Sequence, residues 1–105
     1  MASDRDYLTY ILDQLSGLEG LSHRAMMGEF LFYMQGKVVG GLYDDRLLVK
    51  DVPAARALLP DAPEEIPYPG AKPMLYADCV DDRVALQGLF RALGEALPAP
   101  KKRRG

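Results

Sequence analysis

Alternating apolar and polar positions in residues 29–50 predict an antiparallel sheet at the centre of this protein. The apolar run 29–34 is followed by Gln35-Gly36, and the run 37–43 is followed by Asp44-Asp45 and a third run, 46–50. Short polar breaks between strand-like runs are typical of tight hairpins. We therefore expect three consecutive antiparallel strands here.

The same alternation assigns the two faces of this sheet. If the first turn has two residues, Phe32 lies opposite Val39 and Met34 opposite Lys37. The face expected in the core then carries Leu31, Tyr33, Val38, Leu42, Leu47 and Val49. The opposite face is too apolar to meet only water, and we interpret it as a candidate dimer face made of Phe30, Phe32, Met34, Val39, Tyr43 and Leu48. A one-residue slip would exchange these partners.

Helical periodicity outside the sheet predicts three helices, in residues 3–17, 51–59 and 81–97, each beginning near a serine or aspartate cap. Residues 74–80 are typical of a further strand, and the proline-rich residues 61–70 of a connection or an edge strand. The order helix, three strands, helix, two strands, helix indicates an α+β fold. We expect two layers, with the helices on one face of a mainly antiparallel sheet.

Composition indicates one globular domain with a short tail. The 105 residues are 49% hydrophobic and 27% charged, which suits a single core in residues 1–97. No apolar run approaches the roughly 18 residues of a membrane helix, and the amino terminus lacks a signal-peptide core. A single cysteine agrees with a reducing compartment. We expect a cytoplasmic protein that does not bind membranes, with residues 98–105 disordered.

The charge is unevenly distributed along the chain. The tail residues Lys101, Lys102, Arg103 and Arg104 contribute +4 to a net charge of −2, so the rest of the chain carries −6. An acidic body is a poor surface for nucleic acids. We expect direct nucleic-acid binding only weakly, through the four tail residues.

Few residues could carry catalysis. His23 and Cys79 are the only histidine and the only cysteine, and their expected roles are a polar residue at a strand entrance and a buried thiol. Together they cannot supply a zinc site. The carboxylate pairs at 44–45, 64–65 and 81–82 fall at turns and caps, where acidic residues are common. We expect no catalytic residue, metal or cofactor.

Two blocks of sequence resemble a known family. The first includes RAMMG at 24–28 and LYDDRL at 42–47, and the second includes IPY at 66–68 and GAKPMLY at 70–76. In this order, over roughly residues 3–97, the chain resembles the amino-terminal domain of the TfoX/Sxy competence regulators. Met27 departs from the family pattern, because many members have phenylalanine there.

The resemblance implies a secretion-chaperone-like α+β fold and a bacterial cytoplasmic protein. Full-length members are regarded as transcriptional co-regulators of DNA-uptake genes that act with the cyclic-AMP receptor protein and carry a second, helical domain. The chain is similar to the short stand-alone members. Recurring polar positions of the family are matched by Arg24, Lys50, Tyr68, Lys72 and Tyr76, which form either an interaction surface or structural anchors of strand ends.

The expected function is a non-enzymatic regulatory or protein-interaction module. Its expected partners are a transcription factor or an RNA polymerase component, and a second copy of the chain bound through the candidate dimer face. The alternative is a small-ligand-binding protein or an enzyme with a pocket between the sheet and the last helix. The best residues for that pocket are Tyr68, Lys72, Tyr76 and Cys79.

Overall fold

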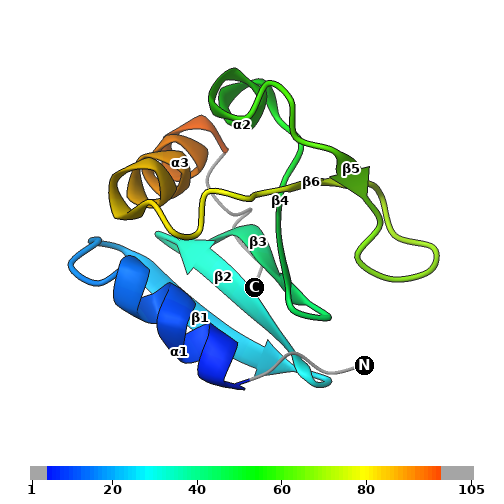
Figure 1. Ribbon diagram of the computed structural model, residues 1–105, viewed down its shortest axis with the longest axis horizontal. Helices are drawn as coiled ribbons and strands as arrows, with labels where there is room; N and C mark the ends of the chain where they lie inside the picture. The colour runs from blue at the N-terminus through cyan, green and yellow to red at the C-terminus, as the bar shows by residue number, and fades with distance from the viewer. Residues whose placement is uncertain (1–4, 98–105) are drawn as a thin grey trace, which may run out of the picture.

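The computed structural model describes residues 5–97 and shows three helices packed against a six-stranded antiparallel sheet (Figure 1). The strand order is β1-β2-β3-β4-β6-β5. In chain order the elements are α1 (Arg5–Gln14), β1 (Leu21–Met26), β2 (Glu29–Met34), β3 (Lys37–Tyr43), β4 (Arg46–Val49), α2 (Pro53–Leu58), β5 (Glu64–Glu65), β6 (Met74–Tyr76) and α3 (Arg83–Ala96). The predicted α+β class and antiparallel sheet are confirmed.

The structure adds one strand to the predicted order. Residues 21–26 form β1, so four strands precede α2 instead of the predicted three. All side chains of β1 except that of Leu21 are exposed, so the strand lacks the apolar alternation that identifies a strand in a sequence. Its turn to β2, Met27-Gly28, has φ values of 52° and 85°, as in a two-residue type I′ hairpin.

The two turns that the sequence predicts are present. Gln35-Gly36 joins β2 to β3, and Asp44-Asp45 joins β3 to β4. All four residues have positive φ, which is the backbone conformation of type I′ turns. The three hairpins therefore follow one another with the same tight geometry, and they fix four strands side by side.

A bulge in β3 changes which residues of β2 and β3 face each other. Met34 pairs with Lys37 as predicted, but Phe32 pairs with Gly40, so Val39 is an extra residue in β3. Close backbone approach accompanies this shift, because a Cβ on Gly41 would lie only 2.5 Å from the Phe30 carbonyl oxygen. The predicted pairing of Phe32 with Val39 is therefore wrong.

Because of the bulge, most of the candidate dimer face is core. Phe30, Phe32, Met34 and Val39 lie beneath the helices, and none is more than 7% exposed. They share this face with three correctly assigned core residues, Leu42, Leu47 and Val49. A dimer contact needs accessible side chains, so the predicted dimer face is wrong for these four residues.

The remaining side chains of the central strands lie on the other face of the sheet, which we call the outer face. Leu31 and Tyr33 belong here rather than in the main core, and Val38, opposite Tyr33, follows them. Tyr43 and Leu48 lie on this face as predicted, but both are buried. The sequence therefore assigned β4 and the second half of β3 correctly, and the error begins at the bulge.

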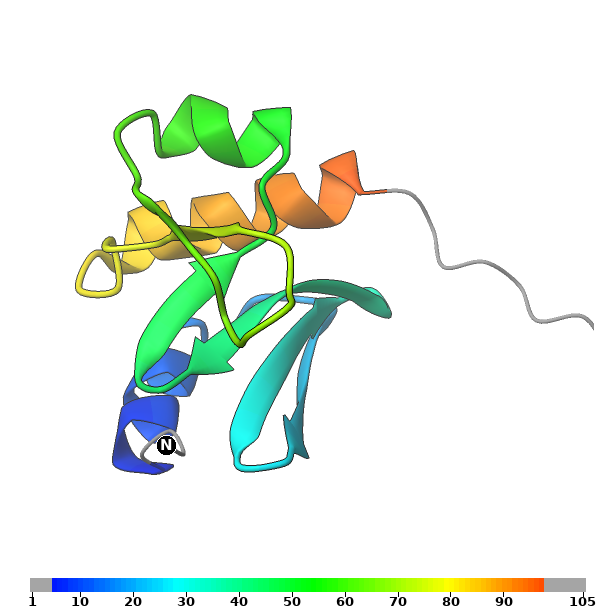
Figure 2. The ribbon, with the colours of Figure 1, turned by 90° about the vertical axis from the view of Figure 1, so that its right-hand side faces the viewer.

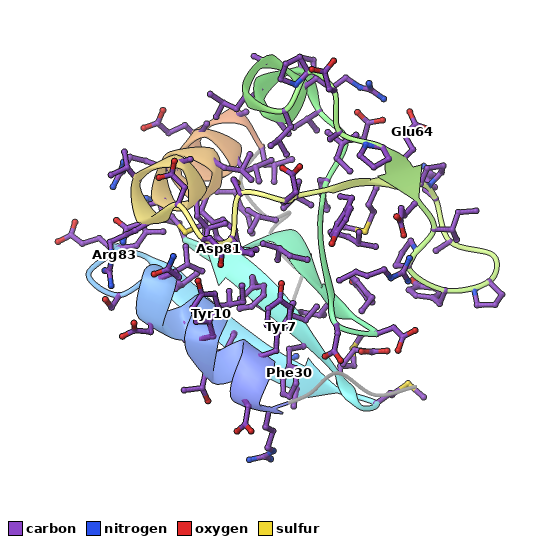
Figure 3. All side chains as sticks on the ribbon, in the orientation of Figure 1. Tyr7, Tyr10, Phe30, Glu64, Asp81 and Arg83 are labelled. Atoms are coloured by element: carbon purple, nitrogen blue, oxygen red, sulfur yellow. The ribbon has the colours of Figure 1, made fainter. Side chains whose placement is uncertain are left out.

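All three helices contribute to the core cluster on the inner face of the sheet. The ring of Phe90 in α3 meets that of Phe32 edge-on, with centroids 5.7 Å apart. Helix α2 contributes Ala55 and lies beside α3 (Figure 2). Tyr10 of α1 points toward Asp81 (Figure 3), and its hydroxyl donates a hydrogen bond of 2.5 Å to that carboxylate.

The predicted helix caps have mixed outcomes. Asp82 caps α3, where its carboxylate accepts a hydrogen bond of 3.1 Å from the Ala85 N–H. Asp51 does not cap α2, whose N-cap is Val52; its carboxylate instead binds Arg56 through two hydrogen bonds of 2.6 and 2.8 Å.

The last predicted strand is shorter than expected, and two predictions concern residues at the ends of the chain. The predicted strand 74–80 is limited to Met74–Tyr76. The predicted cap at Ser3 and the tail at 98–105 lie outside the described residues. Within residues 5–97, no helix is both long and apolar enough to cross a membrane.

Candidate functional site

The outer face of the sheet carries a second apolar cluster, separate from the main core. Its buried members are Leu31, Tyr43 and Leu48, and the half-buried side chains of Tyr33, Met74 and Tyr76 surround them. The segment between β5 and β6, residues 66–73, passes across part of this face (Figure 2). The outer face is therefore apolar at its centre and only partly covered.

A tight turn shapes the segment that crosses the outer face. The Ala71 N–H donates a hydrogen bond of 3.0 Å to the Tyr68 carbonyl oxygen, and Gly70 has a φ of 88°. With Pro69 before that glycine, these are the features of a type II turn. The ring of Tyr68 lies 6.2 Å from that of Tyr43, so an aromatic contact holds the turn against the sheet.

A groove of 520 Å³ lies between this segment and the sheet, and we call it the outer groove. Leu31, Val38 and Tyr43 line it from β2 and β3, and Met26 lines it from β1. Residues 50–52, after β4, and residues of the 67–74 segment complete the lining. Most of these side chains are apolar, with a few polar groups at the rim, as in many binding sites.

The outer groove brings together three of the five predicted interaction residues. Lys50 lies directly after β4, whereas Tyr68 and Lys72 flank the type II turn, and all three line the groove. Lys50 and Lys72 are exposed, and Tyr68 is 57% exposed. Residues about twenty positions apart in the sequence therefore meet at one site.

The other two predicted residues share the outer face but do not line the groove. Arg24 pairs with Leu31 across β1 and β2, and Tyr76 pairs with Leu48 across β6 and β4. Directly paired residues of neighbouring strands project to the same face. Tyr76 is half-buried in the outer cluster, which agrees with structural anchoring, whereas Arg24 is exposed.

The rim of the groove is positive although the protein around it is acidic. Residues 5–97 contain fourteen acidic and nine basic side chains, a net charge of −5. Asp51 also lines the groove, but its carboxylate is bound by Arg56, whose hydrogen bonds lower the pKa of Asp51. Among the ion pairs within residues 5–97, none involves Lys50 or Lys72. Both ammonium groups can therefore meet a ligand.

Tyr43 adds a polar group to the apolar floor. Burial, and then the nearby Tyr68 hydroxyl, raises the pKa of Tyr43. A tyrosine hydroxyl is protonated at neutral pH even without such a shift, so Tyr43 keeps a proton that it can donate in a hydrogen bond.

A protein of Spirochaeta aurantia with the name "Uncharacterized 12.7 kDa protein in trpE 5'region" is 38% identical to this chain over 105 residues. The similarity covers 99% of this chain and 91% of the relative. The chain belongs to the family of that protein. No family model matches the sequence. No solved structure matches it either.

The histidine and the cysteine of this chain do not form a shared site. Cys79 is half-buried against the main core, and burial raises the pKa of its thiol. His23 is exposed on β1. The hydrogen bonds found among residues 5–97 include none between the two side chains.

Two of the three carboxylate pairs, 64–65 and 81–82, take part in structural contacts, and the third, Asp44-Asp45, forms the turn between β3 and β4. Glu64 binds Arg56 at 2.5 Å, and Glu65 binds Arg46. Asp81 binds Tyr10, and Asp82 caps α3. Within the described part of the chain, no group of three or more potential metal ligands comes together.

The structure does not bring the four residues predicted for a pocket between the sheet and the last helix together at that interface. Phe32 and Phe90 fill the centre of that interface. A smaller hollow of 320 Å³ lies between the end of β2 and α3, but none of the four residues predicted for the pocket lines it. Tyr68, Lys72 and Tyr76 belong to the outer face instead, and only Cys79 packs on the helical side. The Pro69-Gly70 pair was the sequence signal that could have revealed the turn.

Proposed function

We propose that this chain is a non-enzymatic protein-interaction module whose partner binds in the outer groove. The observation that carries the proposal is the convergence of Lys50, Tyr68 and Lys72 around an apolar floor. Apolar surface flanked by a few polar groups is the usual composition of a recognition site. The three groove residues also match recurring polar positions of the TfoX/Sxy amino-terminal domain.

That resemblance suggests the class of partner. TfoX/Sxy regulators act on transcription of DNA-uptake genes, so the proposed partner is a transcription factor or an RNA polymerase component in the bacterial cytoplasm. The related secretion-chaperone-like fold is part of the same proposal. The groove supplies the surface on which the proposal can be tested.

Affinity capture with three baits tests this function. The baits are the unaltered chain, a Tyr68→Ala/Lys72→Glu variant, and an Arg91→Glu variant as a control. Arg91 is exposed on α3, away from the outer face, and its reversal gives the same charge change as Lys72→Glu. We expect one transcription protein to be retained by the unaltered chain and the control, and to be lost from the Tyr68→Ala/Lys72→Glu variant. Equal retention by all three baits would contradict the proposal.

A small-ligand-binding protein is the second candidate, because the outer groove has a volume of 520 Å³. Pockets for small ligands usually have volumes of roughly 300–1,000 Å³. A ligand that accounts for this role should raise the Tm of the unaltered chain and of Arg91→Glu, but not of Tyr68→Ala/Lys72→Glu. Native mass spectrometry of protein purified from its host would reveal such a ligand as added mass.

A further inference from the structure

The charges and the apolar side chains at the outer groove together restrict which partner can bind there. We propose that the groove binds an extended acidic segment of a partner protein, with one apolar side chain on the floor and carboxylates next to Lys50 and Lys72. This inference rests on the proposed function, since it specifies the chemistry of the partner of the same site.

Charge complementarity favours an acidic segment. Lys50 and Lys72 are exposed on the rim. Among residues 5–97, the only carboxylate that lines the groove is that of Asp51, and it is bound to Arg56 on α2. Arg24 adds a third exposed cation on the same face, opposite Leu31. Glu29 also lies on this face, opposite Met26, and its carboxylate accepts a hydrogen bond from the Asp44 N–H. These cations stand out because residues 5–97 carry a net charge of −5. An acidic segment is therefore attracted to this surface and repelled by the rest of the protein.

The distribution of exposed apolar side chains favours a polypeptide over a small molecule. The described residues expose seven large apolar side chains, and four of them flank the groove: Met26, Met27, Ile66 and Tyr68. Met26 and Tyr68 line the groove, and Met27 and Ile66 lie next to lining residues in the chain. A molecule enclosed within 520 Å³ does not need apolar surface outside the cavity. A peptide that extends beyond the groove covers this additional apolar surface.

The side chains at the rim also suit a peptide with some variation in sequence. Met26 is 46% exposed and Met27 is 96% exposed at the tip of the first hairpin. Methionine is unbranched and polarizable, so it adapts to differently shaped apolar partners. Specificity then comes from the spacing between the apolar residue and the carboxylates of the peptide.

Fluorescence anisotropy with a labelled peptide tests this inference. The probe is a fluorescein-labelled octapeptide with a central Phe-Leu pair flanked on both sides by glutamates. Two control peptides carry lysines in place of the glutamates, or Gly-Ser in place of Phe-Leu. The groove variant is Lys50→Glu/Lys72→Glu, and the matched control is Arg5→Glu/Arg91→Glu, which changes the net charge equally on exposed helical residues. Circular dichroism checks that both variants are folded.

We expect the acidic Phe-Leu peptide to bind the unaltered chain and the control variant with similar affinity. Binding to the groove variant should be weaker by roughly tenfold or more, and added salt should reduce the difference. Both control peptides should bind the unaltered chain more weakly, because one loses the ion pairs and the other the apolar contact.

Three results would overturn the acidic-segment inference: no binding of the probe to the unaltered chain at about 1 mM, equal binding to the groove variant, or equal binding of either control peptide. None of these results contradicts the proposed function by itself. If affinity capture still shows a partner that depends on Tyr68 and Lys72, the groove remains the interaction site and only the acidic character of the partner is wrong. If the captured partner does not depend on Tyr68 and Lys72, both the proposed function and the acidic-segment inference are wrong.

Discussion

Truncating Phe32 and Tyr33 one at a time tests the bulged register, because these neighbours lie on opposite faces of the sheet. Phe32 is fully buried, and its ring meets that of Phe90 at 5.7 Å. Phe32→Ala should therefore lower the free energy of unfolding by about 3–5 kcal/mol, of which the aromatic pair supplies about 0.5–1.5 kcal/mol. Tyr33 is half-buried at the edge of the outer cluster, so Tyr33→Ala should cost only about 1 kcal/mol.

Urea denaturation and thermal melts measure this difference. For a domain of this size each kcal/mol changes the Tm by about 4–8 °C, so Phe32→Ala should melt at least about 12 °C below the unaltered chain. The stability lost in Phe32→Ala is a large part of the roughly 5–15 kcal/mol that stabilises a typical domain. Phe32→Leu serves as the milder variant if the alanine variant does not fold.

The opposite order of stabilities would refute the register. Without the bulge, Tyr33 faces the main core and Phe32 the outer face, and Tyr33→Ala would then be the more destabilising change. The register without the bulge would also allow Phe32→Asp to yield a folded, soluble monomer. The bulged register instead predicts that Phe32→Asp unfolds, because it places an unpaired carboxylate among the core side chains.

Three further predictions concern single positions. Gly40→Ala should destabilise the protein by about 1–3 kcal/mol, because the added Cβ would press on the backbone of β4. Gly88→Ala, in open space on α3, should instead stabilise the protein by about 0.5–1 kcal/mol. If both variants changed the Tm in the same direction, this reasoning would be contradicted. Lys37→Met should cost about 1 kcal/mol in thermal melts, since the ammonium donates hydrogen bonds to carbonyl oxygens at the carboxyl end of α3; an unchanged Tm would mean that these bonds are unimportant. Burial raises the pKa of Cys79, so less of its thiol is ionised at pH 8. Cys79 should therefore react with a thiol reagent more slowly in the native protein than in urea at the same pH. Equal rates would show that the thiol is accessible in the native protein.

The sequence predicted best those features that depend on a few adjacent residues. The turns at Gln35-Gly36 and Asp44-Asp45 were found because each type of turn requires particular residues at its centre. An aspartate cap of α3 was predicted at Asp81 or Asp82 for the same reason, and the structure has it at Asp82. These signals are local, and packing elsewhere does not change them.

The orientation of β2 could not be predicted in this way, because it depends on contacts between strands. The extra residue at Val39 has no local signature of its own, and the predicted alternation is consistent with either register. Adjacent glycines permit close backbone approach, but the residue type does not determine which strand each glycine meets. In the structure Gly41 lies against β2 and Gly40 against β4.

The candidate site was predicted in its residues but not in its position. Lys50, Tyr68 and Lys72 were identified through the family resemblance, which compares positions and does not place them in space. Their meeting depends on the contact between Tyr68 and Tyr43, which joins a turn to a strand that ends twenty-five positions earlier. A contact over that distance in the sequence follows from the complete fold.

The segment that forms one wall of the outer groove contains prolines at positions 67, 69 and 73, of which Pro67 and Pro73 line the groove. Proline restricts φ before any partner arrives, and the hydrogen bond between Tyr68 and Ala71 restricts the segment further. This part of the site therefore loses less conformational entropy on binding than a flexible loop of the same length. A partner can thus be held by a small number of contacts, and the selection among partners depends mainly on the exposed lysine and methionine side chains at the rim.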